Sequence, residues 1–195
     1  MKKRKGRESI KTITDMPTLT PWGVSQDREE IVPGIVFHST AGHGGFEVCK
    51  KLNNTIPDYM RNEDGWYEED CEWCKIAVIF HEYFLKEYAS ALSTLKNWYP
   101  DEYQKHFGVS LRTNESHTLE RRAFIKDSTN KYVVVSAIRA DNGIVRCHAV
   151  KGGRLKNGQY ASGDHKTFLV PEAEYKIPFV IDVDRHKEEI NGPAR

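Results

Sequence analysis

In GIVFHSTAGHGGFEV, residues 34–48, His43 and three glycines lie between two apolar segments. The first segment, residues 31–40, is rich in β-branched residues, and the second, Phe46–Cys49, alternates apolar and polar side chains. We therefore predict a pair of strands joined by the loop STAGHGG, residues 39–45. Glycine permits close approach of the backbone to another group, and histidine titrates near neutral pH. The loop is either a site built around His43 or a simple turn.

Helices are predicted in the middle of the chain. From Trp66 to Phe84, aromatic and apolar residues recur at steps of three and four, which is typical of a helix with a wide apolar face. A second helix is predicted over Leu85–Trp98, where Pro100 stops it. Asp101–Phe107 then predicts one more helical turn, closed by Gly108.

After residue 118 the sequence pattern changes from one typical of helices to one typical of β-strands. Two β-rich segments, residues 131–138 and 144–150, flank Asn142–Gly143, a dipeptide that favours a tight hairpin turn. Further strands are predicted through Phe168–Val170 and Phe179–Ile181. The order of these elements predicts an α+β fold: an N-terminal strand pair, then two or three central helices packed on a C-terminal antiparallel β-sheet.

The chain of 195 residues is long enough for one ordinary domain. We predict a flexible basic arm over residues 1–19 and a single globular domain over residues 20–195. No segment approaches the roughly 18 apolar residues of a membrane helix, and the N-terminus has no apolar signal segment. These features predict a cytoplasmic protein that does not contact membranes. In that compartment the four cysteines are expected to be reduced thiols.

Charge is distributed unevenly although the net charge is only +1. Residues 58–102 contain eleven acidic and four basic residues, whereas residues 120–166 contain ten basic and four acidic residues. The split indicates either an acidic half and a basic half that steer a charged partner, or two ordinary solvated faces. The basic arm and the basic C-terminal half offer a contact for nucleic acid, with Tyr132 and Tyr160 available for stacking.

The acidic stretch GWYEEDCEW, residues 65–73, lies at the start of the predicted long helix. Acidic residues in a first turn stabilise the helix dipole, which explains them without a function. Asp70, however, falls on the aromatic stripe, and a buried carboxylate needs a partner. His43 is the natural candidate. Such a pair is compatible with a general base, a metal ligand or a satisfied structural contact.

Other chemistries have less support in the sequence. His38 and His43 with Glu69 or Asp70 match no known metal-binding spacing, so no metal and no cofactor is predicted. Cys71 and Cys74 form a single C-x-x-C, which favours packing over a zinc site because a second such pair is missing. Ser39, Thr40 and Cys49 lie near His43, but no nucleophile-elbow motif accompanies them.

Four blocks of the sequence together resemble an uncharacterised domain family of bacterial, plasmid and phage proteins. The blocks are TPWG at residues 20–23, GIVFHSTAGHGGFEV at 34–48, GWYEEDCEW at 65–73 and FLVPEAEY at 168–175. The resemblance covers residues 20 to 185 and implies one continuous domain without implying an activity. The family form before the histidine is Thr-Pro-Ser, whereas this chain has Thr40-Ala41-Gly42, which weakens any argument for a serine nucleophile.

The family pattern falls on the following residues of this chain: Thr20, Pro21, Trp22, Gly23, Gly34, His43, Gly44, Gly45, Trp66, Tyr67, Glu68, Glu69, Asp70, Gly152 and Gly153.

These observations lead to two functional hypotheses, and a structural accessory protein without a site is the third alternative. The first is a counter-defence inhibitor from a phage or plasmid, of the anti-CRISPR or antirestriction type, that binds a host defence protein or ribonucleoprotein complex; it rests on analogy of genetic context. Its predicted binding residues are Trp22, Thr40, Gly44, Gly45, Trp66, Tyr67, Glu68, Glu72 and Arg154. The second is a small hydrolase or nuclease that uses His43 with Glu69 or Asp70, with or without a metal.

Overall fold

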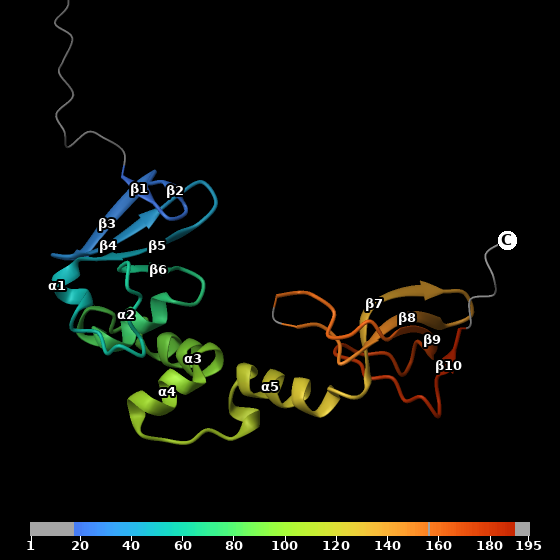
Figure 1. The fold of residues 1–195 in the computed structure, drawn as a ribbon. Coiled ribbons are helices and arrows are strands. Elements are labelled where there is room, and N and C mark those ends of the chain that lie inside the picture. The colour runs from blue at the N-terminus through green and yellow to red at the C-terminus, as the bar shows by residue number, and fades with distance from the viewer. Residues whose placement is uncertain (1–17, 156, 190–195) are drawn as a thin grey trace, which may run out of the picture. The chain divides into compact units, whose positions relative to one another are not determined.

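The computed structural model describes residues 18–155 and 157–189 and has a mixed α+β architecture (Figure 1). Its contacts divide the chain into two compact units, Met1–Leu111 and Arg112–Arg195. Most of the predicted basic arm lies outside the described residues. The prediction of a single globular domain over residues 20–195 stays a prediction, since a division by contacts does not tell whether the two units fold separately.

The first unit is built on a four-stranded antiparallel sheet in the order β3-β4-β5-β6. The strands of this unit are β1 (Leu19–Thr20), β2 (Gly23–Val24), β3 (Asp27–Val32), β4 (Ile35–Ser39), β5 (Gly44–Val48) and β6 (Trp66–Glu68). The predicted strand pair is confirmed as β4 and β5. The turn between them is shorter than STAGHGG, because Gly44 and Gly45 already belong to β5.

Helices cover one face of this sheet (Figure 1). The helices of the first unit are α1 (Lys50–Asn53), α2 (Trp73–Ile79), the 3-10 turn η2 (His81–Tyr83), α3 (Tyr88–Trp98) and α4 (Pro100–Phe107). One core holds Ile35 and Val48 of the sheet together with Ile76 of α2 and Leu95 of α3. Burial of this apolar surface is the main stabilising contribution in the unit.

The predicted long helix from Trp66 to Phe84 is wrong in its first part and too long at its end, because α2 ends at Ile79 and the 3-10 turn η2 follows. Trp66–Glu68 forms β6, which pairs with β5, and the helix begins only at Trp73. Hydrogen bonds to a neighbouring strand override the helical spacing here, which is a tertiary effect. Asp70 is consequently exposed rather than inward, so its predicted need for a buried partner disappears.

The next helices agree better with the sequence. The helix predicted over Leu85–Trp98 is α3, which begins three residues later, at Tyr88. The end of α4 is as predicted, because Gly108 closes it in the left-handed conformation with φ +65°. The sequence analysis missed α5, His117–Ser128, in the second unit, because few apolar residues mark its inner face. Ser116 caps that helix by accepting the backbone N–H of Leu119.

The second unit carries an antiparallel sheet in the order β10-β9-β8-β7. Its elements are the 3-10 turn η3 (Thr113–Glu115), α5, β7 (Tyr132–Ala140), β8 (Ile144–Lys151), β9 (His165–Pro171) and β10 (Lys187–Glu188). The predicted hairpin is confirmed, with Asn142 at φ 60° and Gly143 at φ 70° between β7 and β8. Phe179–Ile181 is not a strand and forms only an isolated bridge through Val180 to Val133.

The predicted fold class and order of elements are therefore confirmed. One detail differs, because α2 and α3 bury their apolar faces against the first sheet rather than against the C-terminal sheet. The C-terminal sheet has its own core, in which Phe168 and Val170 pack with Ile181 of the following loop. An apolar stripe in the sequence predicts that one face of a helix is buried, but it does not predict which sheet packs against that face.

Two of the four cysteines pack in the hydrophobic cores, whereas Cys49 is exposed and Cys71 half-buried. Cys74 and Cys147 are fully buried in different cores. Burial raises the pKa of the Cys74 thiol to about 12 and that of Cys147 to about 11, so both stay protonated near neutral pH. Within the described ranges, no cysteine belongs to a group of three side chains able to hold a metal ion. Among the helices of those ranges, none combines the length and apolar character that crossing a membrane requires.

Candidate functional site

The TPWG block forms a tight turn between β1 and β2 that presents Trp22. Thr20 donates its hydroxyl to the carbonyl of Gly23 at 2.8 Å and accepts the N–H of Trp22 at 3.2 Å. Gly23 adopts φ +124°, a conformation that other residues rarely accept. The motif therefore fixes the position of the Trp22 indole.

The two glycines that begin β5 make room for side chains from elsewhere in the fold. A methyl group on Gly45 would collide with the Trp22 ring and with the carbonyl oxygen of Tyr67. A methyl group on Gly44 would lie 2.5 Å from a carboxylate oxygen of Glu69. The absence of side chains at these two positions thus admits the Trp22 indole and the Glu69 carboxylate to the strand.

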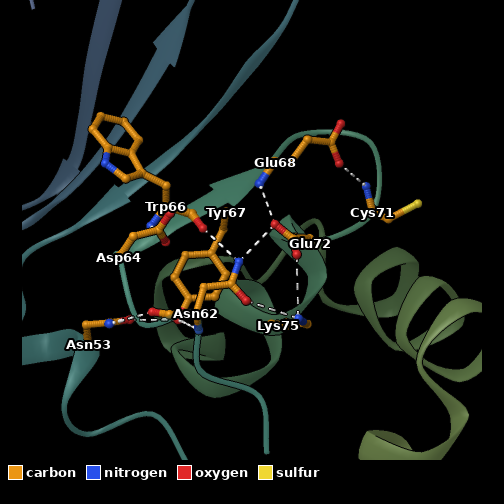
Figure 2. Close-up of polar contacts among 9 residues, drawn as sticks. All are labelled: Asn53, Asn62, Asp64, Trp66, Tyr67, Glu68, Cys71, Glu72 and Lys75. Atoms are coloured by element: carbon orange, nitrogen blue, oxygen red, sulfur yellow. Dashed lines mark hydrogen bonds and ion pairs between the residues drawn. The ribbon is translucent and has the colours of Figure 1, made fainter. Parts of the chain in front are cut away.

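Successive residues of β6 point to opposite sides of the sheet, as Figure 2 shows for Trp66 and Tyr67. Tyr67 faces the core and is fully buried. Trp66 lies on the outer face, where its ring meets that of Trp22 edge to face with centroids 5.8 Å apart. The outer face thus carries a pair of half-buried indoles.

A pocket of about 560 Å³ opens beside these indoles. Its lining consists of Pro21, Trp22, Asn62, Glu63, Asp64, Trp66, Glu68 and Glu72. Four of these residues carry carboxylates, and the lining includes no lysine or arginine. The combination of aromatic walls and anionic groups suits a cationic ligand.

A partly buried polar network holds one wall of the pocket in place (Figure 2). The side-chain amide of Asn62 donates to the Trp66 carbonyl at 2.8 Å and to the Glu72 carboxylate at 2.9 Å. Lys75, only 7% exposed, donates to the Asn62 side-chain oxygen at 3.3 Å and lies 4.5 Å from the centre of the Tyr99 ring. This buried lysine is therefore partnered, as a buried charge must be.

Tyr67 joins this network to the core. Its hydroxyl donates to the Asn53 side-chain oxygen at 2.7 Å and accepts the backbone N–H of Asn62 at 3.0 Å. Burial is the main cause that raises the pKa of Tyr67 to about 12, and the charge of Glu72 adds to it. The hydroxyl therefore stays protonated near neutral pH and keeps its role as a donor.

Next to the pocket, His43 meets the acidic stretch, as the sequence analysis expected. Its Nδ1 atom lies 3.5 Å from a carboxylate oxygen of Glu69 and 3.7 Å from one of Glu68. The His43 side chain is 46% exposed, so this is a surface cluster rather than a sealed core. The backbone brings the two loops together, since the N–H of Glu69 donates to the Gly44 carbonyl.

His43 can contribute to a metal site with two neighbours. One ligand atom each from His43, Glu68 and Asp70 lie within 4.8 Å of one another, a set of nitrogen and oxygen donors that suits a divalent cation. Both oxygens of Glu68 already accept backbone N–H groups, one from Asp70 and one from Cys71. The same carboxylate therefore shapes the turn and faces His43.

Two other candidate residues are used by the fold. Thr40 donates its hydroxyl to the His43 carbonyl at 2.6 Å, which commits the oxygen to closing the turn. His38 is 1% exposed, with Nδ1 3.0 Å from the Ser25 hydroxyl and Nε2 3.2 Å from the Glu47 carboxylate. His38 therefore does not join His43 at a metal.

The structure brings most of the predicted site residues into the first unit. Trp22, Trp66, Glu68 and Glu72 line the pocket, and His43, Glu69 and Asp70 lie in the adjoining loops. Arg154 lies in the second unit, where it donates to the Gly158 carbonyl and stacks on the Tyr160 ring at 4.7 Å.

Sequence reasoning missed Asn62, Asp64 and Lys75. Asn62 lies in a segment interpreted only as irregular connection, and Trp66 and Glu72 become its hydrogen-bond partners only once β6 and the turn after it have formed. Lys75 carried a usable signal, because it is the one charged residue within the apolar segment CKIAVIF, residues 74–80.

The comparisons with known proteins give a family and no activity. The family model "Domain of unknown function (DUF7007)" matches residues 15–129, more than half of the chain, so the chain belongs to this family. No curated protein and no solved structure matches the chain. The matched residues include TPWG, the glycine-rich loop and the acidic stretch, and they end before FLVPEAEY.

The contact between Gly45 and Trp22 predicts that Gly45→Ala lowers the free energy of unfolding by roughly 1–3 kcal/mol, since the added methyl group must displace the indole. Gly42→Ala is the matched control in the same loop. Nothing lies within 4 Å of a methyl group there, so the change is expected to be near neutral. Denaturant unfolding of both variants measures this, and equal stabilities would contradict the packing role of Gly45.

The Tyr67 hydroxyl predicts a second effect on stability. Tyr67→Phe leaves the Asn53 oxygen and the Asn62 N–H without this partner, which costs about 1–3 kcal/mol of unfolding free energy. Tyr83→Phe, at a ring that is 49% exposed, serves as the control and is expected to change little. A loss below about 0.5 kcal/mol for Tyr67→Phe would contradict the network.

Proposed function

We propose that this member of the DUF7007 family is a binding protein whose acidic first unit docks onto a basic surface of a partner protein. The observation that carries the proposal is the charge of that unit: residues 18–111 contain fifteen aspartates and glutamates against eight lysines and arginines. Carboxylates also gather at the pocket beside the two indoles. A surface of one sign attracts a partner of the opposite sign and accelerates encounter.

We infer that the partner is a host nucleic-acid-handling complex and that the protein is a counter-defence inhibitor of a phage or plasmid, of the anti-CRISPR or antirestriction type. The support is the resemblance of its sequence blocks to proteins of mobile elements, together with analogy of genetic context. A channel that holds RNA or DNA is basic. An acidic unit that presents carboxylates in place of phosphates is suited to occupy such a channel.

A contact with nucleic acid through the basic arm and the basic C-terminal half is an auxiliary part of the proposal. Several cations of the second unit already have carboxylate partners. Arg139 pairs with Glu172, Arg146 with Glu189, and Lys166 with Glu188, at 2.7–2.8 Å. These pairs reduce the positive charge available to phosphates. A contact with nucleic acid would therefore depend mainly on the basic arm and on the other lysines and arginines of the second unit.

The leading proposal predicts stoichiometric inhibition that depends on exposed acids of the first unit. A complex recovered from the host by affinity purification is titrated with the protein and with the variant Glu63→Lys/Glu69→Lys. We expect inhibition to require stoichiometric amounts of the protein. The variant is expected to bind the complex about tenfold more weakly, and this difference in affinity should become smaller at high salt.

Asp127→Lys/Asp141→Lys is the matched control, because it makes the same change of charge at two exposed positions of the second unit. Equal weakening by this control would contradict docking through the first unit. Full inhibition at strongly substoichiometric amounts would contradict binding as the mode of action.

A small hydrolase or nuclease is the second candidate, which the approach of His43 to the carboxylates favours. In one form of it, Glu69 orients His43 as a general base. In the other, His43, Glu68 and Asp70 hold a divalent cation that activates water.

The enzyme candidate predicts that His43→Ala lowers the rate of hydrolysis of a nucleic acid or ester substrate by at least about 100-fold. Its thermal unfolding should hardly move, since His43 is a surface residue. Gly42→Ala serves as the control in the same loop. Titration with Mn²⁺ tests the metal form separately, and a rate that depends on neither His43 nor Mn²⁺ would exclude this site as the catalyst.

A further inference from the structure

We propose that the pocket beside Trp22 and Trp66 binds the guanidinium group of an arginine side chain presented by the partner. The inference rests on the proposed function, because it names the chemistry by which the acidic unit recognises a basic surface. It applies to the indole pocket alone, defined by the eight lining residues given above.

The first support is the pair of indoles. Tryptophan is the aromatic ring that attracts cations most strongly, through the negative charge on its ring face. The rings of Trp22 and Trp66 meet with planes at 88°, and both residues line the pocket. The pocket therefore offers indole surface on which a flat cation can stack.

The second support is the way in which the carboxylates are held. Asp64 accepts the backbone N–H of Trp66 at 3.1 Å, and Glu68 accepts those of Asp70 and Cys71 at 2.7 and 3.0 Å. Glu72 is fixed by the Asn62 amide. A carboxylate has about four acceptor sites, so each retains capacity for a ligand while its orientation is already set. Acceptors ordered before binding lower the entropic cost of binding.

The combination favours arginine over other cations. A guanidinium is planar, stacks on aromatic faces and offers a fork of N–H donors that matches carboxylates. A lysine ammonium is more strongly hydrated and makes point contacts only. A hard metal ion gains nothing from indole walls, since it takes oxygen ligands. The pocket volume of about 560 Å³ is ample for one arginine side chain.

A second acidic pocket in the same unit provides an internal comparison. It has a volume of about 540 Å³ and is lined by Glu29, Glu30, Glu82 and Glu87, but it contains Lys86 and a single indole. If charge alone decided binding, the two pockets would behave alike. The inference requires that they differ.

The test uses the full-length protein and three short fluorescent peptides that differ only in one residue type: arginine, lysine or citrulline, the neutral isostere of arginine. Fluorescence anisotropy measures the affinities. We expect the arginine peptide to bind at least about tenfold more tightly than the citrulline peptide and about threefold more tightly than the lysine peptide.

Asp64→Asn/Glu68→Gln removes two charges. The first change keeps the oxygen that accepts the Trp66 N–H, and the second keeps one of the two Glu68 oxygens that accept backbone N–H groups. We expect it to weaken the arginine peptide about tenfold. Glu29→Gln/Glu82→Gln removes the same charge from the comparison pocket and is expected to change the affinity less than twofold. Trp22→Ala tests the indole without changing charge. If the first variant fails to fold, the comparison of the three peptides on the unaltered protein carries the test.

Equal affinities for the arginine and citrulline peptides would overturn the inference. Equal affinities for the arginine and lysine peptides would overturn the choice of a guanidinium ligand. Equal weakening by the two charge variants would overturn the inference as well, because it would mean that the overall negative charge, and not this pocket, attracts the peptide. A host complex that binds the Asp64→Asn/Glu68→Gln variant at full strength would contradict the pocket inference alone. If the arginine peptide binds the protein but affinity purification from the host recovers no partner, the proposed function alone is contradicted.

Discussion

The packing of the Trp22 indole on the bare backbone of Gly45 is the contact on which the outer face of the first sheet depends. It brings the turn between β1 and β2 onto an interior strand of that sheet and sets Trp22 beside Trp66. The neighbouring Gly44 admits the Glu69 carboxylate in the same way. Gly44 and Gly45 therefore serve close packing, and the hydroxyl of Thr40 closes the turn before them.

Beneath the pocket, polar groups are buried without losing their hydrogen bonds. Tyr67, Asn53 and Asn62 form a chain that ends at the Glu72–Lys75 pair (Figure 2). Such a network is stabilising only when its members are satisfied, and the described residues contain no buried side-chain polar atom without a partner. The carboxylate of Glu72 consequently has a defined position at the wall of the pocket.

Charge divides the molecule more sharply than its net value suggests. The acids of residues 18–111 outnumber the bases by seven, and several of them surround the indole pair. In the second unit, by contrast, cations such as Arg139 and Arg146 are paired with carboxylates. The proposed docking surface lies in the acidic first unit, and the half-exposed His43 cluster, on which the alternative enzyme proposal rests, belongs to the same unit.

The sequence by itself determined the features that depend on neighbours in the chain. The β4–β5 pair, the Asn142–Gly143 turn and the end of α4 at Gly108 all follow from local backbone preferences. Only the tertiary structure decided that Trp66–Glu68 is a strand, since β5 supplies its hydrogen bonds. The same holds for the pocket, because Trp22, Asn62 and Glu72 converge from segments that no sequence spacing relates.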